Sequence, residues 1–295
     1  MPMDRTLGIG GSDISIIAGI SKYRTPYELY LDKIGEGEPQ PDNPAMAWGR
    51  ILEDVIANEF AKRNSLKIKR RNKPKFHKTH KFMMAHVDRL IDDGRILEIK
   101  TARFADDNWG KPGTDEIPPQ YYLQVQHYLE VFDSHEAILA VLIAGSDYRE
   151  YTIPRNLDVG QKIITLCSNF WHRVKTKNPP PPSNLSDIQK LYKYDNGNSK
   201  IADQEIIDTV SRVNEIKSQI EQLKTEEENL KHAIGMFLED SSYLLNSLGD
   251  EILSYKTQTK TTVDSKKLKS ENPEIYEKYS KTSESRVMLF KKEKK

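Results

Sequence analysis

Hydrophobic residues recur along the first 180 positions with two different periods, and each period predicts a type of element. Spacings of three and four residues predict helices, whereas alternation at every second residue predicts strands. Helices are expected at 13–18, 25–34, 47–65 and 121–132, with another around Phe170 and Trp171, and strands at 82–91, 96–101, 137–144 and 150–153. Strands interleaved with helices predict an α/β fold, with a central mixed sheet flanked by helices.

A run of prolines, Pro179–Pro182, divides the chain, because neither a helix interior nor a central strand accommodates it. We therefore expect a domain at residues 1–178, a proline-rich linker at 179–200 and an accessory module at 201–295. Within this module a long helix is expected at 201–239, followed by a hairpin and a short helix. The accessory module is thus predicted to be helical with a small β part.

The helix expected at 201–239 has apolar residues at alternating spacings of three and four, interrupted by Thr209 and Glu227. Such a seam is typical of a coiled coil between subunits, or of a long helix packed within one chain. Of these two possibilities we favour packing within the chain.

Composition narrows the class of protein without identifying an activity. The 295 residues include 45 Lys and Arg and 44 Asp and Glu, so the formal net charge is +1. No apolar run reaches the roughly 18 residues of a membrane-spanning helix, and residues 1–6 lack the pattern of a secretory signal. Cys167 is the single cysteine, which excludes an intrachain disulfide and a multi-cysteine metal site. We expect a cytoplasmic protein.

Positive charge is concentrated in one segment. Residues 62–81 contain ten Lys or Arg and no Asp or Glu. A stretch of one sign raises the local potential and attracts a polyanion, so we expect contact with DNA phosphates, with Lys69, Arg70 and Arg71 as candidates. A solvated basic surface is the alternative.

Candidate chemistry lies on the strand expected at 96–101. Because strand side chains alternate, Leu97 and Ile99 should point to one face of the sheet. Glu98 and Lys100 should share the opposite face. A carboxylate there can hold a divalent metal ion, and a neighbouring lysine can orient or deprotonate a water molecule and offset charge on a phosphorane. An ordinary ion pair on a solvated strand would have the same spacing.

Asp88 follows an apolar stretch, where an unpaired carboxylate would be costly. A two-residue hairpin loop would pair Asp88 with Ile99, whereas a three-residue loop with Gly94 in the left-handed conformation would pair it with Glu98. We favour the three-residue loop, because Gly94 falls at its third position. Two adjacent carboxylates repel each other unless a cation lies between them, and oxygen ligands favour Mg²⁺, with Mn²⁺ as a substitute.

These residues also resemble a known family. Asp88 followed by Glu98-Ile99-Lys100 matches the D…(D/E)-x-K core of the PD-(D/E)xK nucleases. Residues 5–180 more closely resemble the YqaJ-type viral recombinases, relatives of the lambda phage exonuclease. The resemblance rests on six segments in this order: Gly10-Gly11-Ser12-Asp13, Thr25-Pro26-Tyr27-Glu28-Leu29-Tyr30, Trp48-Gly49-Arg50-Ile51-Leu52-Glu53, His86-Val87-Asp88, Leu97-Glu98-Ile99-Lys100-Thr101 and Pro118-Pro119-Gln120-Tyr121-Tyr122-Leu123-Gln124-Val125-Gln126-His127-Tyr128.

The resemblance implies a role for each residue of the core motif. Asp88, Glu98 and the backbone carbonyl of Ile99 would hold a metal ion. Lys100 would be the catalytic lysine. Gln124, the first residue of a Q-x-x-x-Y element, would organise the catalytic site.

Three further residues gain roles from the resemblance. Glu53 would reach a second metal position and act in catalysis, and Arg5 and Ser12 would receive a DNA 5′-phosphate. Alternatives stay open for these positions. Glu53 could be a surface residue paired with Arg50, Ser12 could cap a helix, and Gln124 could only cap a neighbouring strand.

The same resemblance implies a metal-dependent exonuclease that degrades one strand of linear double-stranded DNA from 5′ to 3′ and supplies single strands to an annealing protein for phage recombination. It also implies a phage or prophage protein in a bacterial host cell, and a homo-oligomer in the form of a ring trimer. The segment past about residue 200 has no counterpart in the lambda enzyme. A structure- or site-specific endonuclease and a non-catalytic DNA-binding accessory are the alternatives, and the intact acid–acid–lysine set argues against the accessory.

Overall fold

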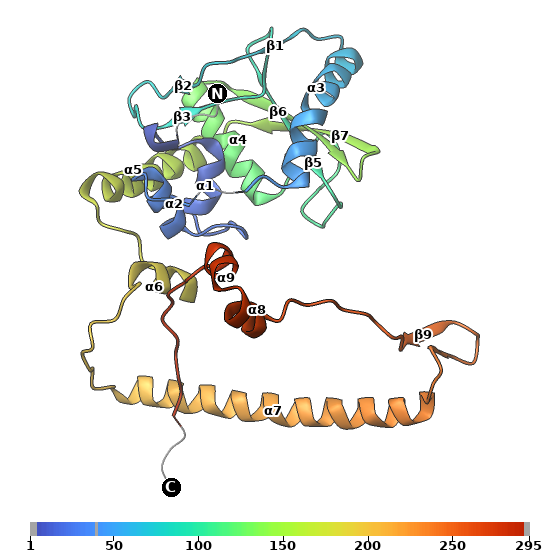
Figure 1. Cartoon of the computed structure of the whole chain (residues 1–295). Coiled ribbons are helices and arrows are strands. Elements are labelled where there is room, and N and C mark those ends of the chain that lie inside the picture. The colour runs from blue at the N-terminus through green and yellow to red at the C-terminus, as the bar shows by residue number, and fades with distance from the viewer. Residues whose placement is uncertain (1–4, 39–40, 292–295) are drawn as a thin grey trace. The chain divides into compact units, whose positions relative to one another are not determined.

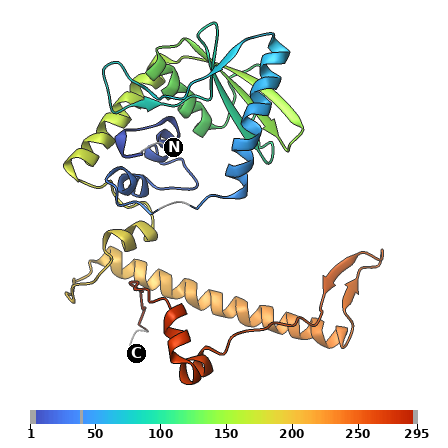
Figure 2. The same ribbon diagram turned by 45° about the horizontal axis from the view of Figure 1, so that its top comes forward.

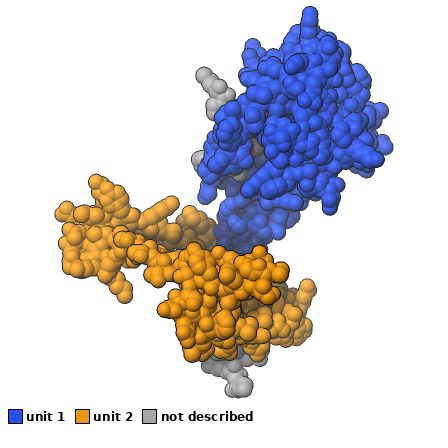
Figure 3. Space-filling model, turned by 90° about the vertical axis from the view of Figure 1, so that its right-hand side faces the viewer, with its two compact units in different colours: residues 1–191 blue, residues 192–295 orange. Residues whose placement is uncertain are grey.

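The computed structural model describes residues 5–38 and 41–291, and of Arg5 it describes the backbone alone. The chain consists of two compact units, residues 1–191 and residues 192–295 (Figures 1 and 3). The first unit contains a mixed sheet with its flanking helices, and the second contains a long helix with several short elements (Figure 1). All the candidate site residues predicted from the sequence belong to the first unit.

A sheet of five strands crosses the described part of the first unit, in the order β1-β4-β5-β6-β7. The strands are β1 (Ile68–Arg70), β4 (Arg89–Ile91), β5 (Ile96–Ala102), β6 (Glu136–Ile143) and β7 (Asp147–Pro154). β5 and β6 run parallel, whereas the other neighbouring strands of this sheet are antiparallel. β6 is apolar at nearly every position because both of its faces are covered. The predicted mixed sheet is confirmed.

Helices cover both faces of this sheet (Figures 1 and 2). They are α1 (Gly11–Ile17), α2 (Pro26–Lys33), α3 (Pro44–Asn64), α4 (Pro119–Phe132) and α5 (Leu157–Thr176), with a short 3₁₀ turn η1 (Arg5–Leu7) before them. On one face, Ile56 and Phe60 of α3 pack with Leu97 of β5. On the other face, a larger core includes Val125 of α4 and Leu139 of β6. The α/β architecture predicted from the sequence is therefore confirmed.

The strand expected at 82–91 is interrupted. β3 (Met84–Ala85) pairs with β2 (Lys75–Phe76) in a separate two-stranded sheet, and β4 begins at Arg89. His86–Asp88 lie between these two strands and belong to neither. The prediction of one continuous strand is wrong over these three residues, because the chain changes from one sheet to the other there. The ladder between β4 and β5 consequently stops just before Asp88.

The hairpin between β4 and β5 has the predicted three-residue loop. The Gly94 N–H donates to the Ile91 carbonyl at 2.9 Å, and Gly94 has a φ of +93°. The register of the two strands follows from this loop, and continuing it by one residue sets Asp88 opposite Glu98. A turn of three residues therefore decides which side chains meet at the start of β4.

The segment expected to be a proline-rich linker contains a helix, α6 (Leu185–Leu191). The Thr25 hydroxyl donates to Asp187 at 2.8 Å, and Lys190 forms an ion pair with Glu28 at 2.5 Å. These contacts attach α6 to α2, so the first unit extends to residue 191 and passes the boundary expected at 178.

The second unit is built on a long helix whose apolar seam is uncovered. Its elements are α7 (Gln204–Leu238), β8 (Tyr243–Leu245), β9 (Glu251–Ser254), α8 (Ser265–Glu271) and α9 (Pro273–Tyr279). The exposed apolar residues of α7 include Ile206, Val210, Ile216, Ile220, Leu223, Leu230, Ile234 and Phe237. These side chains are exposed within the described part of the second unit, and the packing of the seam, within the chain or between subunits, stays a prediction. Like every other helix in the described ranges, α7 lacks the apolar stretch needed to cross a membrane.

Gly94→Ala should destabilise the first unit, because a side chain at a φ of +93° is strained. We expect a loss of about 1 kcal/mol in the free energy of unfolding. Gly235→Ala is the control, since Gly235 lies within α7 with open space around it and alanine favours a helix. Scanning calorimetry measures both variants. An unchanged transition of the first unit in Gly94→Ala contradicts the left-handed turn.

Candidate active site

β5 separates apolar side chains from ionisable ones. Leu97 and Ile99 join the core beneath α3. Glu98 points toward α4, where the Gln124 side chain reaches it, and Lys100 bonds to Glu98 from the same strand. The alternation of the two faces predicted for this strand is confirmed.

Glu98 is almost completely enclosed, with 2% of its surface exposed. Its Oε1 atom accepts hydrogen bonds from Lys100 Nζ at 2.5 Å and from Gln124 Nε2 at 2.7 Å. Its Oε2 atom is buried and has no hydrogen-bonding partner within the described part of the chain. An unsatisfied buried oxygen is unfavourable, so this atom marks a place for a group that the protein itself does not supply.

Asp88 directly precedes Arg89, the first residue of β4. Because Arg89 pairs with Leu97 of β5, Asp88 lies beside Glu98. Its Oδ2 atom accepts a hydrogen bond from the Ile99 N–H at 2.8 Å, in place of the ladder bond that β4 no longer provides. The N–H and C=O of one residue in a strand point toward the same neighbour, so the Ile99 carbonyl faces this edge too. Two carboxylates and a backbone carbonyl thus converge there.

Burial and mutual repulsion govern the ionisation of the site. Burial, followed by the neighbouring Asp88 carboxylate, raises the pKa of Glu98 to about 8, although Lys100 opposes this. Burial also raises the pKa of Asp88. For Lys100, burial favours the neutral amine, but Glu98 and Asp88 outweigh it and raise the pKa of the ammonium group. Lys100 is consequently a cation, held 5.2 Å from the centre of the Tyr121 ring.

The donor set fits a hard divalent cation. The buried carboxylate of Glu98, the half-buried one of Asp88 and a carbonyl supply oxygen ligands, which Mg²⁺ and Mn²⁺ prefer, and the Oε2 atom of Glu98, which has no partner among the described residues, is ready for such an ion. The described residues contain no cluster of three or more His, Cys, Asp or Glu side chains placed to hold a metal. Water or substrate oxygens would therefore complete the coordination, as is usual for Mg²⁺.

Glu53 of α3 is engaged by arginines. Its Oε1 atom accepts hydrogen bonds from Arg89 Nη1 at 2.7 Å and from Arg70 Nη2 at 3.2 Å. The alternative pairing with Arg50 is wrong, because Arg50 pairs with Asp42. The second-metal role remains a prediction, on a carboxylate whose partners are cations of the chain itself.

Arg89 is the site residue that the sequence analysis missed. It is buried, and its guanidinium contacts Glu53, Asp54 and the Asp88 backbone carbonyl. The sequence does contain an indication of this role. Arg89 stands two residues before Ile91, and in a strand these two positions share a face, which here carries apolar side chains. A charged residue at such a position requires a partner.

Gln124 connects Glu98 to the first helix. Its Nε2 atom also donates to the Tyr128 hydroxyl, at 2.8 Å. A Cβ atom at Gly11 would lie 2.4 Å from the Tyr128 ring, so only glycine allows α1 to approach α4 this closely. The role expected for Gln124 as an organiser of the site agrees with its bond to Glu98, and capping of a neighbouring strand is not its contact.

Comparison with known proteins identifies the family. A family model described as the YqaJ-like viral recombinase domain matches residues 3–135. The protein YqaJ of Bacillus subtilis (strain 168) is 32% identical over 294 residues, which are 96% of this chain and 91% of that protein. The chain belongs to the YqaJ-like viral recombinase family. The protein R354 of Acanthamoeba polyphaga mimivirus is 28% identical over 144 residues, 45% of this chain and 26% of that protein.

Two solved structures are distantly similar to this YqaJ-like chain. The alkaline exonuclease LHK-Exo from Laribacter hongkongensis is 19% identical with a TM-score of 0.47, and the match covers 59% of this chain and 91% of that one. A phage related exonuclease from Haemophilus somnus 129PT is 13% identical with a TM-score of 0.43, over 58% of this chain and 96% of that one.

The residues expected at a DNA 5′-phosphate lie at the start of the YqaJ-like domain. α1 begins at Gly11 with Gly10 as its N-cap, so Ser12 is an exposed residue of the first turn, and its predicted role as the cap is wrong. The Asp13 carboxylate accepts the Gly10 N–H at 3.0 Å instead. Arg5 belongs to η1, but its side chain lies outside the described residues.

The three basic residues expected to bind DNA have different surroundings. Lys69 pairs with Asp92 at 2.8 Å, and Arg70 pairs with Glu53 and with Asp54 on α3. Arg71 lies over the ring of Phe132, at 5.7 Å from its centre. Acidic partners on neighbouring segments thus reduce the positive potential that the sequence of residues 62–81 suggests, and DNA contact there stays a prediction.

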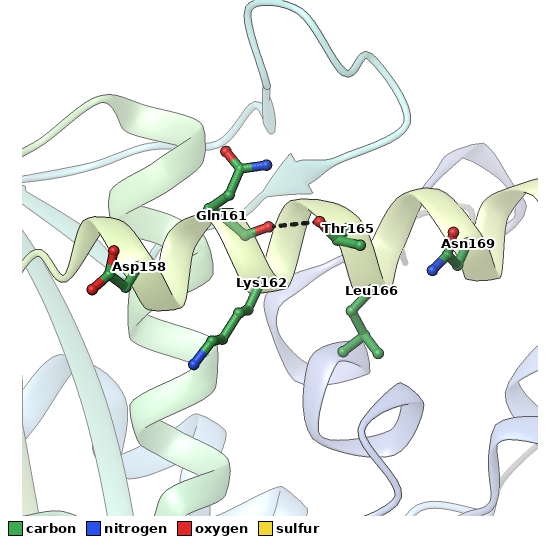
Figure 4. A pocket seen from close by; sticks show the side chains of 6 residues that line it. All are labelled: Asp158, Gln161, Lys162, Thr165, Leu166 and Asn169. Carbon is green, nitrogen blue, oxygen red and sulfur yellow. Dashed lines mark hydrogen bonds between the residues drawn. The ribbon is translucent and has the colours of Figure 1, made fainter.

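A hollow on the outer side of α5 has no part in this chemistry. Its lining residues all project from that single helix (Figure 4): Asp158, Gln161, Lys162, Thr165, Leu166 and Asn169. None of them contributes to the site around Glu98.

Glu98→Gln should change how stability depends on pH in metal-free buffer. The folded chain retains the Glu98 proton up to a pKa of about 8, whereas the ordinary value is 4.5. The contribution of Glu98 to the stability of the wild type therefore falls as the pH rises from 4.5 to about 8, with no further change above. Glutamine carries no such charge. The melting temperature of Glu98→Gln relative to the wild type should thus be higher at about pH 9 than at about pH 5.

Asp147→Asn is the matched control for this experiment, because Arg149 lowers the pKa of the exposed Asp147 carboxyl. Its melting temperature relative to the wild type should not rise with pH. Parallel pH profiles for Glu98→Gln and the wild type in EDTA contradict the burial of Glu98 beside a second carboxylate.

Proposed function

We propose that this YqaJ-like chain is a Mg²⁺-dependent DNA nuclease that acts from the ends of linear duplexes. The observation that carries the proposal is the buried Glu98 with its unpartnered Oε2 atom, flanked by Asp88 and a charged Lys100. A viral recombinase family makes DNA the expected substrate. Mn²⁺ should substitute for Mg²⁺ because it accepts the same oxygen ligands.

The chain's own groups divide the work of phosphodiester hydrolysis. Asp88, Glu98 and the Ile99 carbonyl would hold the metal ion. When bound, such an ion polarises the phosphate and lowers the pKa of a coordinated water molecule. Gln124 keeps Glu98 in place by bonding to Oε1, and Oε2, which has no partner among the described residues, would be left to bind the ion.

Lys100 supplies a fixed positive charge at the reacting phosphate. It remains protonated because two carboxylates lie beside it, and its ammonium group is confined between Glu98 and the Tyr121 ring. A cation held in a dry site stabilises charge that develops on the phosphorane, without having to reorganise during the reaction. The same ammonium group can orient an attacking water molecule.

The finer features of the activity rest on the family resemblance. Degradation would proceed from 5′ to 3′, and the exposed single strand would be passed to an annealing protein for recombination in a phage-infected bacterium. A 5′-phosphate would bind near Ser12, aided by Arg5. Oligomerisation into a ring trimer would enclose the duplex.

Asp88→Asn and Lys100→Met should separate metal binding from catalysis. Asp88→Asn should lose both Mn²⁺ binding and cleavage, because it removes one of two carboxylates. Lys100→Met should bind Mn²⁺ yet cleave at least about 100-fold more slowly. Calorimetric titration with Mn²⁺ and a cleavage assay measure the two properties, and full activity of either variant contradicts the assignment.

Linear and closed-circular duplexes, each with Mg²⁺ or with EDTA, test the mode of cleavage in one gel. An exonuclease degrades the linear duplex with Mg²⁺ and spares the circle. Cleavage of the circle indicates an endonuclease, and binding of DNA without cleavage indicates a non-catalytic accessory.

A 5′-phosphorylated duplex should be degraded faster than the same duplex with 5′-hydroxyl ends, because a guanidinium and helical N–H groups favour a terminal phosphate. Arg5→Ala should lower the rate on the phosphorylated duplex alone. Arg212→Ala is the control, as Arg212 is an exposed arginine of α7 paired with Glu215. Equal rates on both ends in the wild type remove the phosphate pocket from the proposal.

A further inference from the structure

Arg89 is buried beside the site and makes three polar contacts. Only 5% of its side chain is exposed. Its Nη1 atom donates to Glu53 Oε1 at 2.7 Å and to the Asp88 backbone carbonyl at 2.6 Å, and Nη2 bonds to Asp54. One guanidinium thereby joins α3 to the residue that carries the first metal-binding carboxylate.

The contact with the Asp88 carbonyl fixes the backbone at a point where regular pairing has ended. The β4–β5 ladder stops at Arg89, so Asp88 has no ladder bonds to hold it. Instead its carbonyl accepts from Arg89, and its carboxylate accepts from the Ile99 N–H. These two bonds together determine where the Asp88 carboxylate lies.

The contacts with Glu53 and Asp54 compensate the charge of the buried guanidinium. Arg70 approaches the same two carboxylates from the solvent side, with 53% of its side chain exposed. Two arginines and two carboxylates balance one another within this cluster. Burying an arginine without such partners would be strongly unfavourable, so the cluster is expected to stay together.

A second divalent ion does not fit this cluster. Glu98 accepts hydrogen bonds from one charged and one neutral donor, whereas both donors to the Oε1 atom of Glu53 are guanidinium cations, so the charge of Glu53 is already balanced. A dication next to it would also face the buried charge of Arg89 in a region where charges are weakly screened. The role implied for Glu53 at a second metal position therefore disagrees with its partners.

We propose that Arg89 is a positioning residue that holds Asp88 in place and keeps Glu53 out of metal coordination, so that the site takes one divalent cation. This inference rests on the proposed nuclease function, which takes Asp88 and Glu98 as the metal-binding carboxylates. On the α4 face of the sheet a metal ion would then balance the charge of Asp88 and Glu98. On the α3 face the Arg89 guanidinium balances the charge of acidic residues of α3.

Counting Mn²⁺ ions on the full chain tests the inference without any assay of cleavage. Paramagnetic resonance of free Mn²⁺ during titration should show one bound ion per chain, and Asp88→Asn should abolish it. Glu53→Gln should retain the one ion with its affinity changed less than about threefold, since loss of a true ligand costs more. Two ions in the wild type, falling to one in Glu53→Gln, overturn the inference.

A double-mutant cycle distinguishes this role from mere support of the fold. In an Arg89→Met background Glu53 loses its buried partner, so adding Glu53→Gln should then weaken Mn²⁺ binding at least about tenfold. The same addition in an Arg70→Met background should have no such effect, because Arg89 is still present. An effect of Glu53→Gln that is equal in the wild-type and Arg89→Met backgrounds contradicts the guarding role of Arg89.

The two levels of proposal fail in different ways. If no Mn²⁺ binds in a manner that depends on Asp88 and Glu98, the proposed function itself is wrong. If one such ion binds but Glu53 contributes to it in the wild type, the nuclease assignment stands and the role of Arg89 is wrong. Should Arg89→Met fail to fold, the Mn²⁺ count of Glu53→Gln decides alone.

Discussion

The site depends on holding two carboxylates side by side where little water can reach them. Asp88 and Glu98 repel each other, and burial adds to the free energy of ionising either one. The fold compensates with groups from different elements: the ammonium of Lys100, the amide of Gln124 and the backbone N–H of Ile99. β4 must stop early so that the Ile99 N–H can serve the Asp88 side chain, and α4 must lie against β5 so that Gln124 can reach Glu98.

Asp88, just before β4, and Arg89, the first residue of β4, send opposite charges to opposite faces of the sheet. Asp88 contributes a carboxylate at the edge beside Glu98, while Arg89 contributes a guanidinium to the acidic residues of α3. The two-residue period of a strand makes this division unavoidable once the hairpin register is set. A register shifted by one residue would bring Arg89 beside Glu98, and two carboxylates could no longer share a cation. The left-handed Gly94 therefore controls the electrostatics of both faces through the length of one loop.

The sequence predicts well those parts of the site that depend on local geometry. The register follows from Gly94 and the alternating faces of β5, both of which are properties of a few adjacent residues. The partners of Arg89 could not be predicted in the same way, because Glu53 is 36 positions away and an arginine after an aspartate has no distinctive pattern. α6 was missed because the prolines before it dominate the local signal, whereas the Asp187 carboxylate accepts a hydrogen bond from Thr25, at the start of α2, and another from the nearby Ser183 N–H. Long-range contacts decide the partners of Arg89 and the docking of α6.

The neutrality of Gln124 explains how Glu98 can be anchored and still attract a cation. An arginine at that position would neutralise the charge of the carboxylate, as Arg89 and Arg70 do for Glu53. An amide donates one good hydrogen bond to Oε1 without cancelling the negative charge, and the Tyr128 hydroxyl fixes that amide in turn. Lys100 partly balances the charge, yet the Oε2 atom stays without a donor. Each glutamate accepts hydrogen bonds from two donors at its Oε1 atom, so the charge of those donors separates a carboxylate available to a metal ion from one that the protein has already neutralised.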